Sequence, residues 1–260
     1  MKSIIENYVL LFFVGSVLGW MMEVICKLIQ YHRFINRGFL IGPYCPIYGF
    51  GSVLLTVLLT PYVNSPVIVF FMAMVICGTL EYLTSYLMEK LFHARWWDYS
   101  QKRFNLHGRV CADTLIPFGI LGLGMIYVVK PFLFEQFNLL SATLKNWLCG
   151  GLLALLLCDT VISTTVLSKI RSAADKAEGD STEEITRNIR AVLHQKGILF
   201  RRALHAFPDV HLYNSRLLSA LRERRKQLQG ELKAKKAAFI AEVQKQEQAL
   251  KDELKAKKGK

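Results

Sequence analysis

Hydrophobic residues gather in five runs over the first two thirds of the chain, and each run is followed by a polar or basic stretch. An α-helix needs about 20 residues to cross a hydrocarbon core about 30 Å thick. The pattern therefore predicts five membrane-spanning helices, at about residues 4–26, 43–59, 67–87, 110–129 and 147–167. The fold class we expect is all-α, with a polytopic membrane domain over residues 1–168.

The second run is the weakest of the five, because glycine and proline are dense where it begins. This composition predicts a defined non-helical path and a broken or re-entrant start to the helix. The residues expected to form this turn are Asn36, Arg37, Gly42, Pro43, Pro46, Tyr48 and Gly49.

The loops between the runs alternate in charge. Basic residues follow the first, third and fifth runs, whereas the loop over residues 60–66 carries no charge. The positive-inside rule then places the N-terminus outside and the basic loops and the C-terminal tail in the cytoplasm.

The last third of the chain is dominated by Lys, Arg, Glu and Gln. We expect a cytoplasmic helical linker over residues 169–213 and a long basic helix over residues 214–260. Apolar pairs recur there every eleven residues, a period that keeps one stripe on a straight or slightly right-handed helix. The pairs are Leu217/Leu221, Leu228/Leu232, Phe239/Val243 and Leu250/Leu254.

Three interpretations of this tail stay open. It could form a coiled coil that makes the protein a homo-oligomer, lie on the anionic inner leaflet, or remain a solvated helix. Nucleic acid is not an expected partner, because the tail has no aromatic interleaving beyond Phe239 and no recognised binding module.

Sequence motifs exclude several kinds of chemistry. The six cysteines are scattered without a C-x-x-C pair, so neither a disulfide framework nor a metal site is expected, and no cofactor is expected either. No Walker A, H-E-x-x-H or G-x-S-x-G motif occurs, so the chain does not carry its own Walker ATPase.

Acidic residues inside the apolar runs are the main candidates for function, because ionisable groups at membrane depth are costly to keep. Glu23 continues a row of small residues, Gly15 and Gly19, that favours close helix packing. Glu81 and Ser85 form a similar row in the third run, with Glu89 expected at the headgroup level.

Asp113 begins the fourth run and Asp159 lies midway in the fifth. One acidic group in each of four runs suggests a shared polar interior or substrate path. That path would comprise Glu23, Glu81, Ser85, Asp113 and Asp159. The alternative is a set of interhelical hydrogen bonds that only hold the helices together.

A polar and aromatic loop follows the third run. Its candidate residues are Arg95, Trp96, Trp97, Asp98, Tyr99, Asn105, His107, Gly108 and Arg109. The tryptophans could serve as an anchor at the membrane interface. Alternatively, the loop could bind a lipid headgroup, a polar substrate or a partner protein.

Together, the turn before the second run and this loop resemble the bacterial CmpB-type family, labelled type IV ABC-transporter permeases. The resemblance covers about residues 5–165 and rests on Asn36 to Gly49, Glu81-Tyr82, Glu89-Lys90-Leu91-Phe92, Trp96 to Ser100 and Asn105 to Arg109. It implies a multi-pass protein of the bacterial cell membrane. Transport of a small solute or lipid would then need a separate ATP-binding subunit or ion coupling.

Two other functions stay open beside the permease. One is a membrane-embedded enzyme acting on a lipid or polar headgroup, with His107, Arg109, Asp98 and Glu81 as acid, base and anion clamp. The other is a non-catalytic scaffold whose tail recruits cytoplasmic partners.

Overall fold

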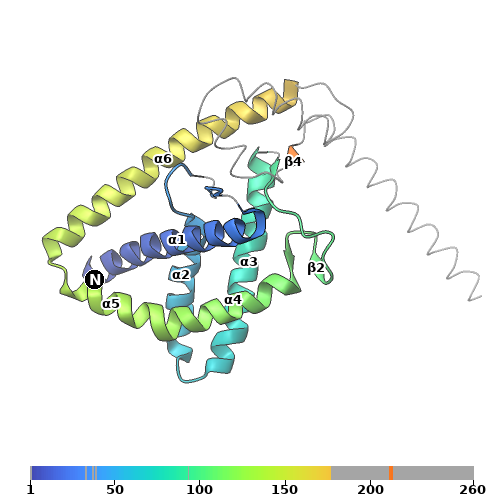
Figure 1. Cartoon of the computed structure of the whole chain (residues 1–260). Coiled ribbons are helices and arrows are strands. Elements are labelled where there is room, and N and C mark those ends of the chain that lie inside the picture. Colours follow the sequence, from blue (N-terminus) through green and yellow to red (C-terminus); the bar gives the residue numbers. More distant parts are fainter. Residues whose placement is uncertain are drawn as a thin grey trace, which may run out of the picture. The chain divides into compact units, whose positions relative to one another are not determined.

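The computed structural model describes residues 2–176, apart from residues 33, 37, 39 and 93, together with residues 211–212. This part of the chain is mostly helical (Figure 1). Arg37, most of the predicted linker over residues 169–213 and the predicted basic helix over residues 214–260 lie outside the described residues.

Within the described residues, four helical segments are long and apolar enough to cross a membrane. They are α1 (Lys2–Tyr31), α3 (Pro66–Phe92), the continuous segment Ala112–Leu139, and the part of α6 (Ala142–Lys176) up to Lys169. These correspond to the first, third, fourth and fifth predicted spans.

The second predicted span forms a shorter helix, α2 (Pro46–Leu59), which continues in the 3₁₀ turn η1 (Thr60–Tyr62). The helix begins at Pro46 because a proline fits the first helical turn. Backbone N–H groups in that turn have no acceptor within the helix, so the N–H that proline lacks is not needed there. The residues before it follow a non-helical path, as predicted.

The fourth span contains a π-helical turn, η2 (Met125–Val129), between α4 (Ala112–Gly124) and α5 (Lys130–Leu139). Pro131 follows this turn and cannot donate a hydrogen bond to the carbonyl of Tyr127, so the regular α-helical ladder is interrupted there. The continuous helical segment begins at Ala112, two residues later than predicted, and ends at Leu139, ten residues beyond Val129.

Glycines bring α1 and α2 into close contact. A Cβ atom on Gly15 would overlap Ser52, and one on Gly19 would overlap the Tyr48 ring. A Cβ atom on Gly49 of α2 would likewise overlap the Ser16 side chain and the Phe12 carbonyl of α1. The predicted role of Gly15 and Gly19 in close helix packing is confirmed.

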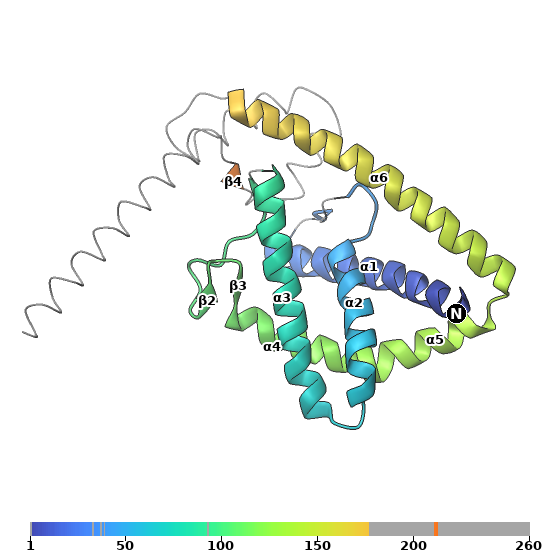
Figure 2. The ribbon, with the colours of Figure 1, turned by 180° about the vertical axis from the view of Figure 1, so that it is seen from behind.

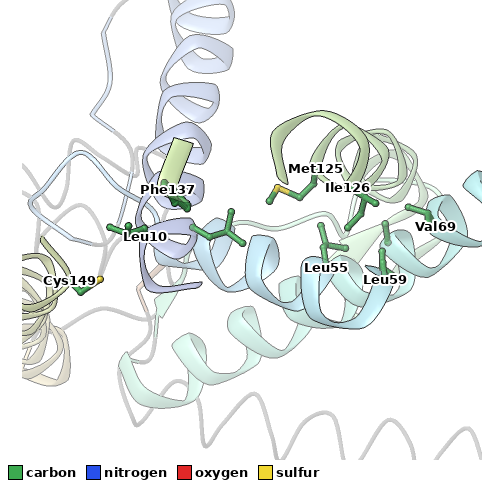
Figure 3. Packing of buried hydrophobic residues seen from close by; sticks show 10 residues of the cluster. Leu10, Leu55, Leu59, Val69, Met125, Ile126, Phe137 and Cys149 are labelled. Carbon is green, nitrogen blue, oxygen red and sulfur yellow. The ribbon is translucent and has the colours of Figure 1, made fainter. Parts of the chain in front are cut away.

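A buried hydrophobic cluster joins α1, α2, α3, η2, α5 and α6. Figure 3 shows Met125 and Ile126 of η2 directed toward Leu55 and Leu59 of α2, with Val69 of α3 beside them. Between membrane-spanning helices such close packing stabilises through dispersion contacts, because lipid tails are as apolar as these side chains. This cluster therefore fixes the helices that carry the polar residues described next.

Short strands complete the described part of the chain. β2 (Asn105–Leu106) and β3 (Val110–Cys111) form an antiparallel hairpin directly before α4, and β1 (Ala94–Arg95) pairs with β4 (His211–Leu212). Figure 2 shows the hairpin beside α4, and α2 and α3 running antiparallel next to each other.

Candidate functional site

A buried acidic cluster forms where α1, α2, α3 and α4 meet the loop after α3. Glu81 of α3 is 8% exposed and accepts hydrogen bonds from the Tyr99 hydroxyl at 3.2 Å and the Thr114 hydroxyl at 3.3 Å. Glu23 of α1 accepts a shorter bond, 2.6 Å, from the Tyr48 hydroxyl of α2. We call Glu23, Tyr48, Glu81, Tyr99 and Thr114 the Glu81 cluster.

Tyr99 links the two carboxylates of the Glu81 cluster electrostatically. Burial raises the pKa of the Tyr99 hydroxyl above its usual value, and the negative charges of Glu81 and Glu23 raise it further. The hydroxyl therefore stays protonated and acts as a donor toward Glu81. The two predicted carboxylates thus lie near one side chain of the predicted loop.

Glu81 is held by hydroxyl groups alone. No basic side chain in the described part of the chain forms an ion pair with it. The Thr114 hydroxyl also has a closer acceptor, the Cys111 carbonyl at 2.8 Å, so its single proton is shared between two acceptors. A buried carboxylate with such long and shared bonds is incompletely compensated.

Two arginines from the loop converge on Glu89, one helical turn beyond Ser85 on α3. Arg109 lies 3.0 Å and Arg95 3.5 Å from Glu89 Oε2. Arg109 also donates to the Ser85 hydroxyl at 3.1 Å, and Arg95 forms a second ion pair with Asp98 at 3.2 Å. We call these five residues the arginine network.

Aromatic side chains surround the arginine network. The Arg109 guanidinium lies 5.8 Å from the Tyr82 ring centre and 5.5 Å from that of Tyr86, within the range of a cation–π contact. His107 Nδ1 contacts the Tyr82 hydroxyl at 3.0 Å, and Trp97 donates to the Arg109 carbonyl at 3.0 Å. The predicted loop residues are therefore gathered around α3.

The sharp turn of the loop depends on Gly108, whose φ of +68° suits glycine. A Cβ atom at this position would also lie 2.6 Å from the Asp98 carboxylate. The backbone N–H of Gly108 donates to the Asn105 side chain at 2.8 Å, and its carbonyl accepts from the Tyr99 N–H at 2.8 Å. Gly108 therefore fixes the position of Tyr99 toward Glu81.

Asp159 of α6 forms a separate site. It is 8% exposed and accepts hydrogen bonds from the backbone N–H groups of Ile41 and Gly42, each at 2.8 Å. The Tyr44 hydroxyl adds a third donor at 2.7 Å and Ser163 a fourth at 2.9 Å. Asp159 thereby holds the predicted turn before α2, and we call this arrangement the Asp159 clamp.

Other residues of the turn before α2, of which Asn36 and Pro43 were predicted, take part in neighbouring contacts. Asn36 accepts a 2.8 Å hydrogen bond from the Trp20 indole, and the N–H of Cys45 donates to the Ser16 carbonyl at 2.9 Å. Burial raises the pKa of the Tyr44 hydroxyl above its usual value, and the hydrogen bond to Asp159 and its charge add to the increase. Pro43 lies in the non-helical path between Gly42 and Tyr44.

Asp113, like Asp159, does not join the Glu81 cluster, so the four predicted carboxylates do not share one interior in the described structure. The Asp113 side chain is two-thirds exposed and pairs with Lys102 at 3.4 Å. The physical reason is its position in the first turn of α4, where exposed N–H groups favour an acidic side chain at the surface.

A further polar contact at the other end of the helices was not predicted as a site. Lys145 of α6 is buried and donates to the Asn7 side chain at 3.0 Å, while Asn7 donates to Asn138 at 3.3 Å. Buried lysines are rare. The sequence nevertheless predicts that Lys145 lies in a loop, because it precedes the fifth apolar run, which begins at residue 147. Only the packing of α1 against α6 shows that it is enclosed.

Sequence reasoning also undervalued Glu89 and missed Thr114 and Tyr44. The i, i+4, i+8 spacing of Glu81, Ser85 and Glu89 did contain a signal for Glu89, because it places the three on one helical face. No local pattern marks Thr114 or Tyr44. Among the described residues, no group of His, Cys, Asp and Glu side chains could hold a metal ion.

The fold and the polar residues between its helices define a multi-pass helical membrane protein with a buried acidic cluster near a cationic loop. Residues 10–164 match the family described as "Putative ABC-transporter type IV". The chain belongs to this family, as the sequence resemblance indicated. It is therefore an ABC-transporter-related membrane component. The chain matches no curated protein and no solved structure.

Proposed function

We propose that the protein is the permease-type component of a transporter and moves a small solute or lipid along a path beside Glu23, Glu81 and Ser85. The observation that carries this proposal is the incompletely compensated carboxylate of Glu81 on a spanning helix. Such a group is costly in a membrane unless it serves a purpose. Its two donors come from the loop and from α4, so any movement of the loop would change its environment.

The proposed topology has five spans, with the N-terminus outside and the C-terminus in the cytoplasm of a bacterial cell. α2 and η1 contain 14 and three residues and are together about 27 Å long, close to the thickness of the hydrocarbon core. Glu23, eight residues before the end of α1 at Tyr31, contacts Tyr48 in the first turn of α2. At the opposite end of α2, Lys130 reaches Thr60. These contacts support α2 as a connection between the two membrane faces.

The Arg95–Arg109 loop is the proposed cytoplasmic gate or docking surface. It connects the Glu81 cluster to the outside of the helices through Tyr99, so a partner that moves the loop would act directly on Glu81. Energy would come from a separate ATP-binding subunit or from ions that use the carboxylates, because the chain has no Walker motif.

The variant Glu81→Gln tests the role of the carboxylate. We expect it to reach the membrane at wild-type levels and to fail to complement a deletion strain, because glutamine keeps the size of the side chain and removes the charge. Asp113→Asn is the matched control, since it makes the same chemical change at an exposed ion pair. Full complementation by Glu81→Gln would refute the proposed path.

The existence of an ATPase partner needs a separate experiment. The tagged protein would be purified in a gentle detergent from its native membrane, and the proteins and lipids that accompany it would be identified by mass spectrometry. A stoichiometric nucleotide-binding subunit would support the permease. A tightly held lipid without an ATPase would favour the alternative of an enzyme that acts on lipids.

That enzymatic alternative uses the loop residues beside Glu81, with Arg109 as the clamp for an anionic headgroup. Arg109 is engaged by Glu89 and Ser85, and Arg95 by Glu89, Asp98 and the His107 carbonyl. With both guanidinium groups compensated, the described contacts favour the transport component.

The scaffold alternative predicts that deletion of residues 214–260 abolishes function as completely as deletion of the whole gene.

A further inference from the structure

The open end of the β2–β3 hairpin, away from its turn at residues 107–109, exposes apolar side chains outside the helices. Phe104 is 88% exposed and Leu106 is 54% exposed, and the basic residues Lys102 and Arg103 precede them. We call these four residues the hairpin base. Exposed apolar side chains are normal on the lipid-facing sides of spanning helices, but here two of them lie beside two basic residues on a loop rich in polar side chains.

The exposure of Phe104 is built into the backbone of the loop. The Asn105 side chain donates to the Lys102 carbonyl at 2.7 Å and to the Ser100 carbonyl at 3.3 Å, and it accepts from the Gly108 N–H. Phe104 itself has a φ of +51°, which is uncommon for a residue other than glycine. These bonds hold the hairpin base in one conformation, in which Phe104 is turned outward.

The strand register places the hairpin base at the start of α4. Asn105 pairs with Cys111, so the next pair outward sets Phe104 opposite Ala112, the first residue of α4. The ion pair of Lys102 with Asp113, the second residue of α4, gives the same placement independently.

With the topology proposed above, on which this inference rests, the start of α4 lies close to the membrane surface. The apolar part of this span, residues 112–129, is about 27 Å long and therefore has to begin near the boundary to cross a core about 30 Å thick. Phe104 consequently lies at the depth of the lipid headgroups.

We propose that the hairpin base is a lipid-binding contact, in which Phe104 and Leu106 insert into the interfacial layer and Arg103 binds anionic headgroups. The combination of aromatic, aliphatic and basic side chains suits this layer. Trp96 and Trp97 do not have this position, because Trp96 is buried and Trp97 donates to the Arg109 carbonyl.

A photoreactive phenylalanine analogue, p-benzoylphenylalanine, placed at position 104 tests this contact in the full-length protein. In vesicles of phosphatidylethanolamine and phosphatidylglycerol, illumination should attach lipid to position 104. The same analogue at Trp97, in the same loop, is the control and should react within the protein. Lipid attachment severalfold above this control supports the proposal. Crosslinks from position 104 to another protein, or no product, would overturn it.

A second variant avoids the bulky analogue. Phe104→Trp adds one indole to the four native tryptophans, whose fluorescence is common to the variant and the wild-type protein. The additional fluorescence of the variant, obtained by subtracting the wild-type signal, should be quenched by brominated lipids and protected from acrylamide in the aqueous phase. Quenching by acrylamide alone would place residue 104 in water and contradict the proposal.

Discussion

Glu81 and Asp159 are both buried carboxylates on long apolar helices, and both are 8% exposed, yet their surroundings differ. Asp159 accepts four hydrogen bonds of 2.7–2.9 Å, two of them from backbone N–H groups. Glu81 accepts two bonds of 3.2–3.3 Å, both from hydroxyls. The difference separates a carboxylate that holds a loop in place from one that retains the capacity to change its partners.

The largest effect on stability is expected from breaking the Asp159 clamp. Asp159→Asn replaces one acceptor oxygen by a donor that faces the N–H or hydroxyl groups of the turn. Because bonds to a charged group contribute about 1.5–3 kcal/mol each, we expect a loss of about 3 kcal/mol in unfolding free energy. Thermal unfolding in detergent would measure it. A variant as stable as the wild-type protein would contradict the structural role of the clamp.

Replacing the carboxylate of Glu81 by an amide should affect function strongly and stability little, the reverse of what we expect at Asp159. Glu81→Gln is expected to change the unfolding free energy by less than about 1 kcal/mol, because only two long hydrogen bonds are altered. Function should nevertheless be lost, as proposed above. A large loss of stability together with the loss of function would place Glu81 beside Asp159 as a structural residue.

Two tyrosines offer a finer comparison, because each donates its hydroxyl to one of these carboxylates. Tyr44→Phe removes a 2.7 Å bond to Asp159 and should lower the unfolding free energy by about 1.5 kcal/mol. Tyr99→Phe removes a 3.2 Å bond to Glu81 and should cost about half as much. Parallel thermal unfolding of both variants measures the order, and the reverse order would contradict the comparison.

The smallest expected effect is a dependence on alkaline pH. The pKa values of Tyr44 and Tyr99 are raised above the usual value of about 10, so each folded hydroxyl keeps its proton where the unfolded one begins to lose it. Their contribution is fully present below about pH 10 and declines as the pH rises beyond it. Unfolding measured from pH 7 to 11 should show this decline, and the Tyr44→Phe variant should show less of it.

Local patterns predicted the helices well and the partners of the polar residues poorly. The row from Gly15 to Glu23 and the row from Glu81 to Glu89 follow from helical periodicity, and the structure keeps each on one face. Sequence spacing could not indicate that Asp159 binds Ile41, which lies 118 residues away. It also suggested Trp96 as an interfacial anchor, although the structure buries Trp96 and exposes Phe104.

The sequence by itself determined the apolar helices, the position of the proline-rich turn before α2, the membership of the family and the choice of Glu23 and Glu81 as candidates. These depend on composition and on short-range periodicity, which are local properties of the chain. Only the tertiary structure decided that Glu89 binds both loop arginines, that Asp113 faces outward and that Asp159 closes a clamp. These contacts depend on which helix ends pack against each other around the hydrophobic cluster, and local sequence patterns do not determine that packing.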